Sequence, residues 1–136
     1  MTVPHQRAQA KLQKRIRVLL SEQAVEAFEG NTRVHRFECV TGDNGHPTGR
    51  GTFKIFRKNH PYRSRSYDVQ MDYAMFFTQD GKALHQYHGL IPLSVVRTAR
   101  QNVSDWFGSH GCVRLTEPDA RALYEWAPVG TVVQVQ

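Results

Sequence analysis

The chain has 136 residues, 40% of them hydrophobic, which suits one compact domain with a buried core and leaves little room for a second domain. Its longest apolar runs are only a few residues, which excludes a membrane-spanning helix. The formal net charge of +6 favours an anionic partner, such as nucleic acid, anionic lipid or an acidic cell-wall polymer, without choosing among them.

The chain is predicted to begin with a basic segment, residues 1–15, and to continue as one domain over residues 16–136. Strand-like sequence occupies 16–20 and 23–28 and is followed by a Glu-Gly-Asn turn signal. Residues 34–40 then alternate apolar and polar side chains with period two, as in a half-buried strand. The pattern predicts a hairpin or meander at the start of the domain.

The middle of the chain is predicted to be β-rich and interrupted by loops. Residues 41–51 are dense in Gly, Asn, Asp and Pro and predict a loop, and 52–56 predicts the next strand. Residues 57–68 are polar with weak periodicity, which predicts an irregular excursion of the kind that often forms a binding loop or lid. Strands at 73–77 and 82–85 flank a Gln-Asp-Gly turn and predict a hairpin.

One helix is predicted, late in the chain. Residues 86–108 have little strand signal apart from Val95 and Val96. Thr116 can cap the start of a helix that has a proline in its first turn and extends to about Trp126. A closing strand follows at 131–135. The overall prediction is a mostly β domain with one late helix.

Two cysteines occur in very different sequence settings. Cys39 belongs to the apolar side of an alternating strand and is predicted to be a small buried hydrophobe. Cys112 belongs to the string Ser-His-Gly-Cys-Val-Arg-Leu, just before the predicted helix. Helix N-terminal amides and a nearby imidazolium would increase the acidity of its thiol. Cys112 is therefore the candidate nucleophile.

A cysteine nucleophile needs a group that takes its proton, and three histidines are candidates. His110 is only two residues from Cys112, so a supporting role in the turn fits it better. His85 ends a predicted strand that could hold its ring rigidly, and it is preferred over His88. Backbone amides of Gly111 and Cys112 are candidate oxyanion donors.

Two further features concern ligands. The planar guanidinium of Arg114 suits a carboxylate on the substrate. The histidines near the cysteine raise the question of zinc, but the sequence has neither C-x-x-C nor H-E-x-x-H, so no metal or other cofactor is predicted.

The string from Ser109 to Leu115, followed by a helix and a closing Gly-Thr-Val-Val strand, resembles the L,D-transpeptidase catalytic domain of the YkuD-like family. The resemblance extends to the P-T-G-x-G-x-F-x-I stretch at 47–55 and to G-x-A-L-H at 81–85. It covers the chain from about residue 16 to the end. The fold that it implies is a single β-sandwich-like domain with the nucleophile on a loop under a lid.

The resemblance also implies roles for individual residues. Cys112 matches the nucleophile and His85 the base, while Ser109, His110 and Gly111 match the other positions of the motif, the last two at the oxyanion site. Arg114 stands where some members have asparagine, and Tyr67 matches a lid tyrosine. The segment between His85 and Ser109 is longer than is usual in the family, and counting from His88 improves the fit. Both histidines therefore remain candidates, and the extra length is expected to remodel one wall of the substrate groove.

The activity that the resemblance implies is peptidoglycan transpeptidation. The thiolate would attack the meso-diaminopimelate–D-Ala bond of a stem tetrapeptide, and an amine would take the acyl group in a 3→3 crosslink. Hydrolysis of the same bond, as by an L,D-carboxypeptidase, is the alternative. Carbapenems are expected inhibitors. The family implies the cell envelope; the chain as given has no recognisable export signal, so cytoplasmic wall recycling is the alternative.

Two classes without this activity are also open: a non-catalytic wall-binding module, and a nucleic-acid binder suggested by charge alone. The predicted partner is the peptidoglycan stem peptide and not nucleic acid.

Overall fold

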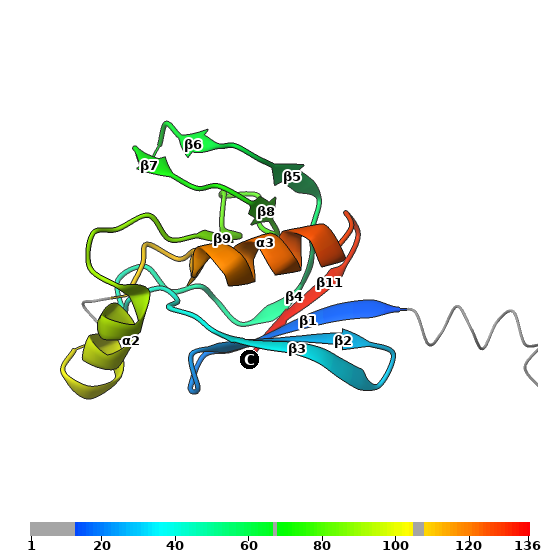
Figure 1. Ribbon diagram of the computed structural model, residues 1–136, viewed down its shortest axis with the longest axis horizontal. Coiled ribbons are helices and arrows are strands. Elements are labelled where there is room, and N and C mark those ends of the chain that lie inside the picture. Colours follow the sequence, from blue (N-terminus) through cyan, green and yellow to red (C-terminus); the bar gives the residue numbers. More distant parts are fainter. Residues whose placement is uncertain (1–12, 67, 105–107) are drawn as a thin grey trace, which may run out of the picture.

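A computed structural model describes residues 13–66, 68–104 and 108–136. These residues form two larger β-sheets, which share a core, a small two-stranded sheet and two helices (Figure 1). The first sheet has the strand order β3-β2-β1-β11-β4. Its strands are β1 (Lys14–Leu19), β2 (Ala24–Glu29), β3 (Thr32–Glu38), β4 (Gly51–Lys54) and β11 (Val132–Val135). β1 pairs antiparallel with β2 and parallel with β11, so the two ends of the domain meet in this sheet.

The second sheet contains the strands that support the candidate site, in the order β10-β9-β8-β5. Its strands are β5 (Arg57–Asn59), β8 (Ala74–Phe76), β9 (Ala83–Gln86) and β10 (Val113–Leu115). β8 and β9 form the antiparallel hairpin that the sequence predicts, and β10 pairs parallel with β9. A small separate hairpin joins β6 (Arg63–Ser64) to β7 (Val69–Gln70).

Within the described residues, the helices are α2 (Leu93–Asn102) and α3 (Glu117–Trp126). α3 begins after Thr116 and has a proline in its first turn, so the prediction of a late helix is confirmed, although the Thr116 side chain makes no capping hydrogen bond. It buries Ala120 and Leu123 in a core to which both sheets contribute. At its C-terminal end the Lys58 ammonium donates to the carbonyls of Tyr124 and Ala127, which satisfies groups that a helix end leaves without intrahelical partners.

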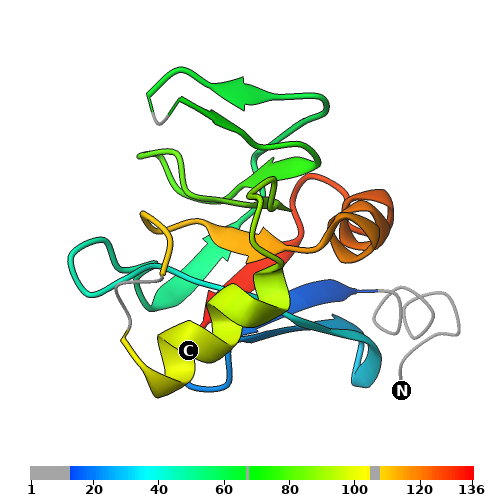
Figure 2. The same cartoon turned by 60° about the vertical axis from the view of Figure 1, so that its left-hand side comes forward.

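The prediction of a mostly β domain is confirmed, but two local predictions are wrong. Val95 and Val96 lie in α2, not in a strand-like or irregular stretch. Leu93 and Val96, three residues apart, share the helix face that packs against Val40 and Tyr87. In Figure 2, α2 is the yellow helix at the lower front of the molecule. A helical spacing of apolar residues therefore outweighs the β preference of two adjacent valines.

The second wrong prediction concerns residues 57–68, which are not wholly irregular. They contain β5, which extends the second sheet, and β6. Both strands are short and polar, so the period-two pattern has too few residues to be visible.

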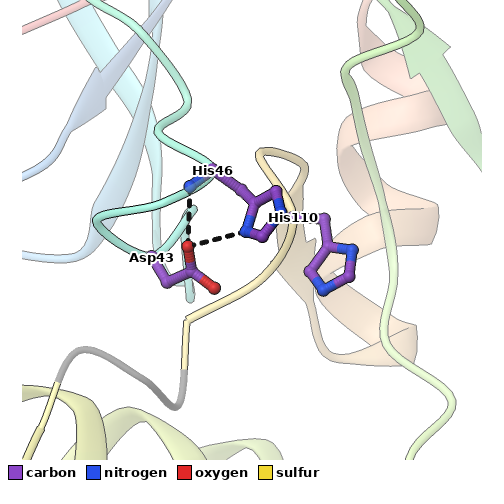
Figure 3. A group of neighbouring side chains, drawn as sticks. All are labelled: Asp43, His46 and His110. Carbon is purple, nitrogen blue, oxygen red and sulfur yellow. Dashed lines mark hydrogen bonds and ion pairs between the residues drawn. The ribbon is translucent and has the colours of Figure 1, made fainter.

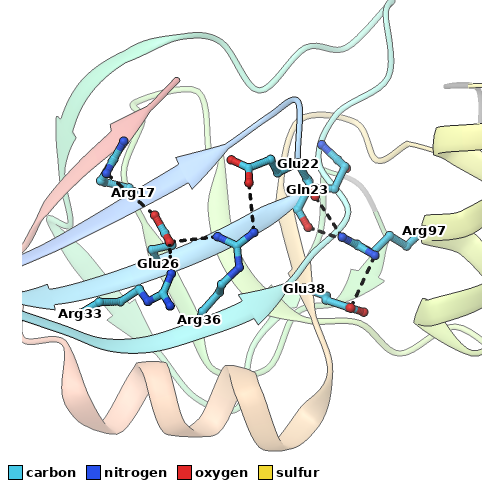
Figure 4. Close-up of polar contacts among 8 residues, drawn as sticks. All are labelled: Arg17, Glu22, Gln23, Glu26, Arg33, Arg36, Glu38 and Arg97. Atoms are coloured by element: carbon cyan, nitrogen blue, oxygen red, sulfur yellow. Dashed lines mark hydrogen bonds and ion pairs between the residues drawn. The ribbon is translucent and has the colours of Figure 1, made fainter.

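A carboxylate surrounded by arginines lies on the first sheet (Figure 4). Glu26 accepts hydrogen bonds from Arg33 at 2.7 Å and Arg36 at 2.9 Å, and its other oxygen lies 3.9 Å from Arg17. The hydrogen bond from Arg33, opposed by desolvation and assisted by the bond from Arg36, lowers the pKa of Glu26. This network crosses β1, β2 and β3 and holds the three strands together on their polar side.

Neither helix is long and apolar enough to span a bilayer; this applies to the part of the chain that the structure describes.

Candidate active site

The pairing of β9 with β10 brings together side chains that are far apart in the sequence. In the parallel register, His85 is the partner of Arg114, and Leu84 is the partner of Val113. Cys112 immediately precedes β10, so it lies beside the start of β9, with its Sγ 3.9 Å from the carbonyl oxygen of Gly81. The second sheet therefore positions a cysteine, a histidine and an arginine at one place.

These three side chains line the same pocket, which has a volume of about 260 Å³. The β7 region contributes apolar walls and the nucleophile loop contributes the polar end. The lining residues are Val69, Met71, His85, Gly108, Ser109, His110, Cys112 and Arg114. An adjoining pocket of about 370 Å³ shares Val69, His85 and Arg114 with the first, so the two form one larger groove.

The ring of His85 is held in a defined orientation. Only 4% of the residue is exposed, and Nδ1 lies 2.7 Å from the backbone oxygen of Gln86. A carbonyl oxygen only accepts, so Nδ1 carries the proton and Nε2 of the neutral ring is left as the acceptor. Burial lowers the pKa of His85 to about 4; the bond to Gln86 opposes this effect and the positive charge of Arg114 adds to it. At neutral pH His85 is an uncharged base.

The Cys112 thiol differs from its sequence-based prediction. The sequence predicts increased acidity from a helix N-terminus and a neighbouring imidazolium, but Cys112 is only 8% exposed and burial raises its pKa. The backbone of Ala83 and the charge of Arg114 act in the opposite direction without cancelling this effect. The physical reasons are that β10 separates Cys112 from the start of α3, and that His85, which lines the same pocket, is neutral. The resting pair is therefore a neutral thiol and a neutral imidazole.

Ser109 closes the turn that presents the cysteine. Its hydroxyl donates to the carbonyl of Cys112 and accepts the N–H of Gly111 at 3.2 Å. Gly111 has φ of +117°, a left-handed backbone conformation that glycine adopts without strain. The Gly111 amide, predicted as an oxyanion donor, is thus bonded to Ser109 in this structure.

The other two candidate histidines are placed differently from His85. His110 is exposed on the pocket edge, where its ring stacks on His46 with centroids 4.3 Å apart. His88 lines only the adjoining pocket, and its Nε2 lies 3.0 Å from a carboxylate oxygen of Asp72. Of the three, His85 is the buried one that shares the main pocket with Cys112.

Arg114 joins the two pockets. Its guanidinium lies over the ring of Tyr87, 5.5 Å from the centroid, and burial lowers its pKa. The guanidinium remains charged at neutral pH, so it supplies a positive charge to the groove. Tyr67, the predicted lid tyrosine, lies outside the described residues.

The structure adds site residues that the sequence reading missed. Val69 and Met71 form the apolar wall of the pocket, and the alternation of Val69, Gln70 and Met71 with polar neighbours was the available signal for them. Lys82 lies against the nucleophile loop, with its Cε only 2.8 Å from where a side chain on Gly111 would begin. No sequence pattern connects Lys82 with Gly111.

The long segment between His85 and Ser109 contains α2. Its first residues, Tyr87 to Gly89, line the adjoining pocket, as expected of a segment that remodels a groove wall. Among the described residues, none from α2 lines either pocket. The extra length is thus divided between a groove wall and a peripheral helix.

The fold is similar to that of solved L,D-transpeptidases. L,D-transpeptidase (Yku) from Stackebrandtia nassauensis matches with a TM-score of 0.76 and 32% identity over 91% of this chain and 55% of that chain. An L,D-transpeptidase from Mycobacterium smegmatis gives 0.73 and 23% over 91% and 58%, respectively. L,D-transpeptidase 3 from Mycobacterium tuberculosis, with a faropenem-derived adduct, gives 0.71 and 20% over 90% and 60%. The chain therefore spans a little over half the length of these solved relatives.

Fold and site together define a domain of the L,D-transpeptidase class with a cysteine and a histidine in one groove. The sequence model of YkuD, the L,D-transpeptidase catalytic domain, matches residues 13–135. The chain belongs to this family, which is a family of enzymes. Among curated proteins, none matches the chain significantly.

Proposed function

We propose that the protein is a peptidoglycan L,D-transpeptidase that uses Cys112 as its nucleophile and His85 as its base. The observation that carries the proposal is the shared pocket of Cys112 and His85, in which the Gln86 carbonyl orients the imidazole. Membership of the YkuD family supports the substrate class, a stem tetrapeptide containing meso-diaminopimelate. Because the family implies the cell envelope, that compartment is the proposed place of the activity.

The first half-reaction forms an acyl-enzyme. Nε2 of His85 accepts the proton of the Cys112 thiol as Sγ attacks the carbonyl at the L-centre of meso-diaminopimelate. The tetrahedral intermediate then collapses, its C–N bond breaks, and the imidazolium returns the proton to the amine of the departing D-alanine. Because both groups are neutral at rest, proton transfer accompanies attack and no standing ion pair is needed.

The nucleophile loop is the proposed source of oxyanion stabilisation. The backbone amides of Gly111 and Cys112 are suited to this role because glycine permits close approach of the chain to the substrate. The amide of Gly111 would have to exchange its hydrogen bond with Ser109 for one with the oxyanion. Such an exchange strengthens binding as negative charge develops on the oxygen.

Arg114 is the proposed contact for a carboxylate of the stem peptide. Its guanidinium lines the pocket beside Cys112 and can donate two parallel hydrogen bonds to a carboxylate. The rest of the peptide is proposed to lie in the groove that continues past His85 and Tyr87. In the second half-reaction an amine attacks the thioester and takes the acyl group, and the Cys112 thiol is regenerated.

Product analysis tests the proposal. Purified protein is incubated with a disaccharide tetrapeptide, and products are followed by mass spectrometry. A 3→3 crosslinked dimer with release of D-alanine is the expected product, whereas tripeptide alone would assign the protein to L,D-carboxypeptidases. Turnover by Cys112→Ala equal to wild type would refute both; Cys39→Ala is the control that retains activity.

The base is tested by comparing the two histidines. His85→Ala is expected to lower the rate of acyl-enzyme formation by about 10²–10⁴-fold, the usual contribution of a general base. His88→Ala is expected to have a much smaller effect. The opposite order would transfer the base role to His88.

A carbapenem provides a second probe of the nucleophile. The strained β-lactam carbonyl is expected to acylate Cys112 and give one adduct per protein, detectable by intact mass. No adduct is expected with Cys112→Ala.

A further inference from the structure

Three side chains of the kinds that ligate metals meet at the outer edge of the pocket. Asp43, His46 and His110 each offer a ligand atom, and these atoms all lie within 4.8 Å of one another (Figure 3). Nδ1 of His46 lies 2.9 Å from Oδ1 of Asp43. Figure 3 shows the Asp43 and His46 side chains on one loop and His110 on the neighbouring one. Two imidazoles and a carboxylate are a common protein ligand set for zinc.

The backbone that carries these side chains is already joined. The N–H of Asp43 donates to the carbonyl of Ser109 at 2.9 Å, and the N–H of Ser109 donates to the carbonyl of Thr41 at 2.8 Å. The N–H of His46 donates to the Asp43 carboxylate at 2.7 Å, which fixes that side chain toward His46. The ligands therefore stand on two loops held at a constant separation, as a preformed site requires.

We propose that Asp43, His46 and His110 bind a divalent transition-metal ion, for which Zn²⁺ is the representative probe. Ligands arranged tetrahedrally at zinc distances are about 3.4 Å apart, so the 2.9 Å contact between His46 and Asp43 must open and any pair near the 4.8 Å limit must close. Both imidazoles are exposed side chains and can rotate out of their stacked arrangement to reach one ion. Three protein ligands leave a coordination position for water or a ligand.

The ligand set selects the kind of ion. Two imidazole nitrogens suit Zn²⁺, Co²⁺, Ni²⁺ or Cu²⁺, whereas Mg²⁺ and Ca²⁺ prefer oxygen ligands. The protein carries a net charge of +6, and the Arg100 guanidinium donates to the carbonyl of Gly42 next to the site. General electrostatic attraction therefore does not favour a cation here, and binding depends on direct coordination.

An ion in this site would connect the loop of Asp43 and His46 to the loop that carries the nucleophile. His110 is two residues before Cys112 and lines the same pocket. An ion that binds only the folded protein stabilises it in proportion to occupancy. The expected effect of Zn²⁺ is thus a higher Tm, independent of catalysis.

Spectroscopy with Co²⁺ distinguishes this site from metal capture by the pocket cysteine. Untagged, metal-free protein is titrated with Co²⁺ and the absorption spectrum is recorded. Visible d–d bands at one equivalent, without a sulfur-to-cobalt charge-transfer band, are expected. A strong charge-transfer band that disappears in Cys112→Ala would instead place the ion on the thiolate and overturn the proposal.

Calorimetric titration with Zn²⁺ tests the individual ligands. His46→Ala and Asp43→Asn are each expected to weaken binding at least about tenfold and to abolish the rise in Tm. The control His35→Ala removes a histidine on β3, outside the cluster, and is expected to bind like the wild type. Wild-type affinity in His46→Ala, or no binding by the wild-type protein, would overturn the proposal.

Discussion

The buried imidazole of His85 gives a prediction about stability and pH. In the unfolded chain a histidine has a pKa of 6.5, and burial in the folded protein lowers the pKa of His85 to about 4. As the pH falls below 6.5, the unfolded chain takes up a proton that the folded protein does not, so stability decreases. The decrease continues until about pH 4, where the folded protein is also protonated, and then levels off.

The size of the effect follows from the two pKa values. At about 1.4 kcal/mol per tenfold difference, the full loss of free energy of unfolding is about 3 kcal/mol. About 2 kcal/mol of it is lost between pH 7 and pH 5. The group is 4% exposed, so solvent screening removes little of this energy.

The assay is guanidinium unfolding of the wild type and of His85→Gln at both pH values, followed by tryptophan fluorescence. Every carboxylate is common to the two proteins, so the difference between their pH dependences isolates His85. The wild type is expected to lose about 2 kcal/mol more than the variant. Equal losses would refute the reasoning. In the proposed enzyme, the acid limb of kcat/KM is correspondingly expected near pH 4, well below the 6.5 of a free histidine.

Three further predictions concern packing, charge and reactivity. Gly42→Ala is expected to lower the free energy of unfolding by about 1–3 kcal/mol, and with it the Tm, because the new Cβ would lie 2.0 Å from a backbone oxygen. Gly45→Ala is the control: its Cβ would lie 3.5 Å from the nearest atom, so little change is expected. Glu26→Gln is expected to lower the free energy of unfolding by about 1.5–3 kcal/mol in urea titrations at pH 7, because its 9% exposed carboxylate would lose charged hydrogen bonds. Glu22 is 55% exposed, and Glu22→Gln is expected to lower the free energy of unfolding by less than about 1 kcal/mol. Iodoacetamide is expected to label the pocket cysteine and leave Cys39 unlabelled in the native protein, because Cys39 is fully buried and burial raises its pKa to about 12; peptide mapping checks this.

Three results would contradict these predictions. They are equal Tm changes in the two glycine variants, equal costs of the two glutamate variants, and native labelling of Cys39.

Much of the fold was predictable because its signals are local. The alternation in β3, the Gln-Asp-Gly turn between β8 and β9, and the start of α3 with a proline in its first turn each depend on a few adjacent residues. The burial of Cys39 followed from the same alternation and is confirmed. α2 was missed because two adjacent valines suggested a strand, although Leu93 and Val96 had the spacing of a helix face.

The sequence by itself determined the family, because the Ser-His-Gly-Cys string and its flanking strands are contiguous patterns. Only the tertiary structure decided that His85, and not His88, lines the Cys112 pocket as a buried ring, since that depends on the parallel pairing of β9 with β10. The same is true of the neutral resting state of the thiol and imidazole, because a pKa responds to burial and to charges that distant segments supply. Only the tertiary structure also reveals the cluster of Asp43, His46 and His110, because these residues lie on two separate loops.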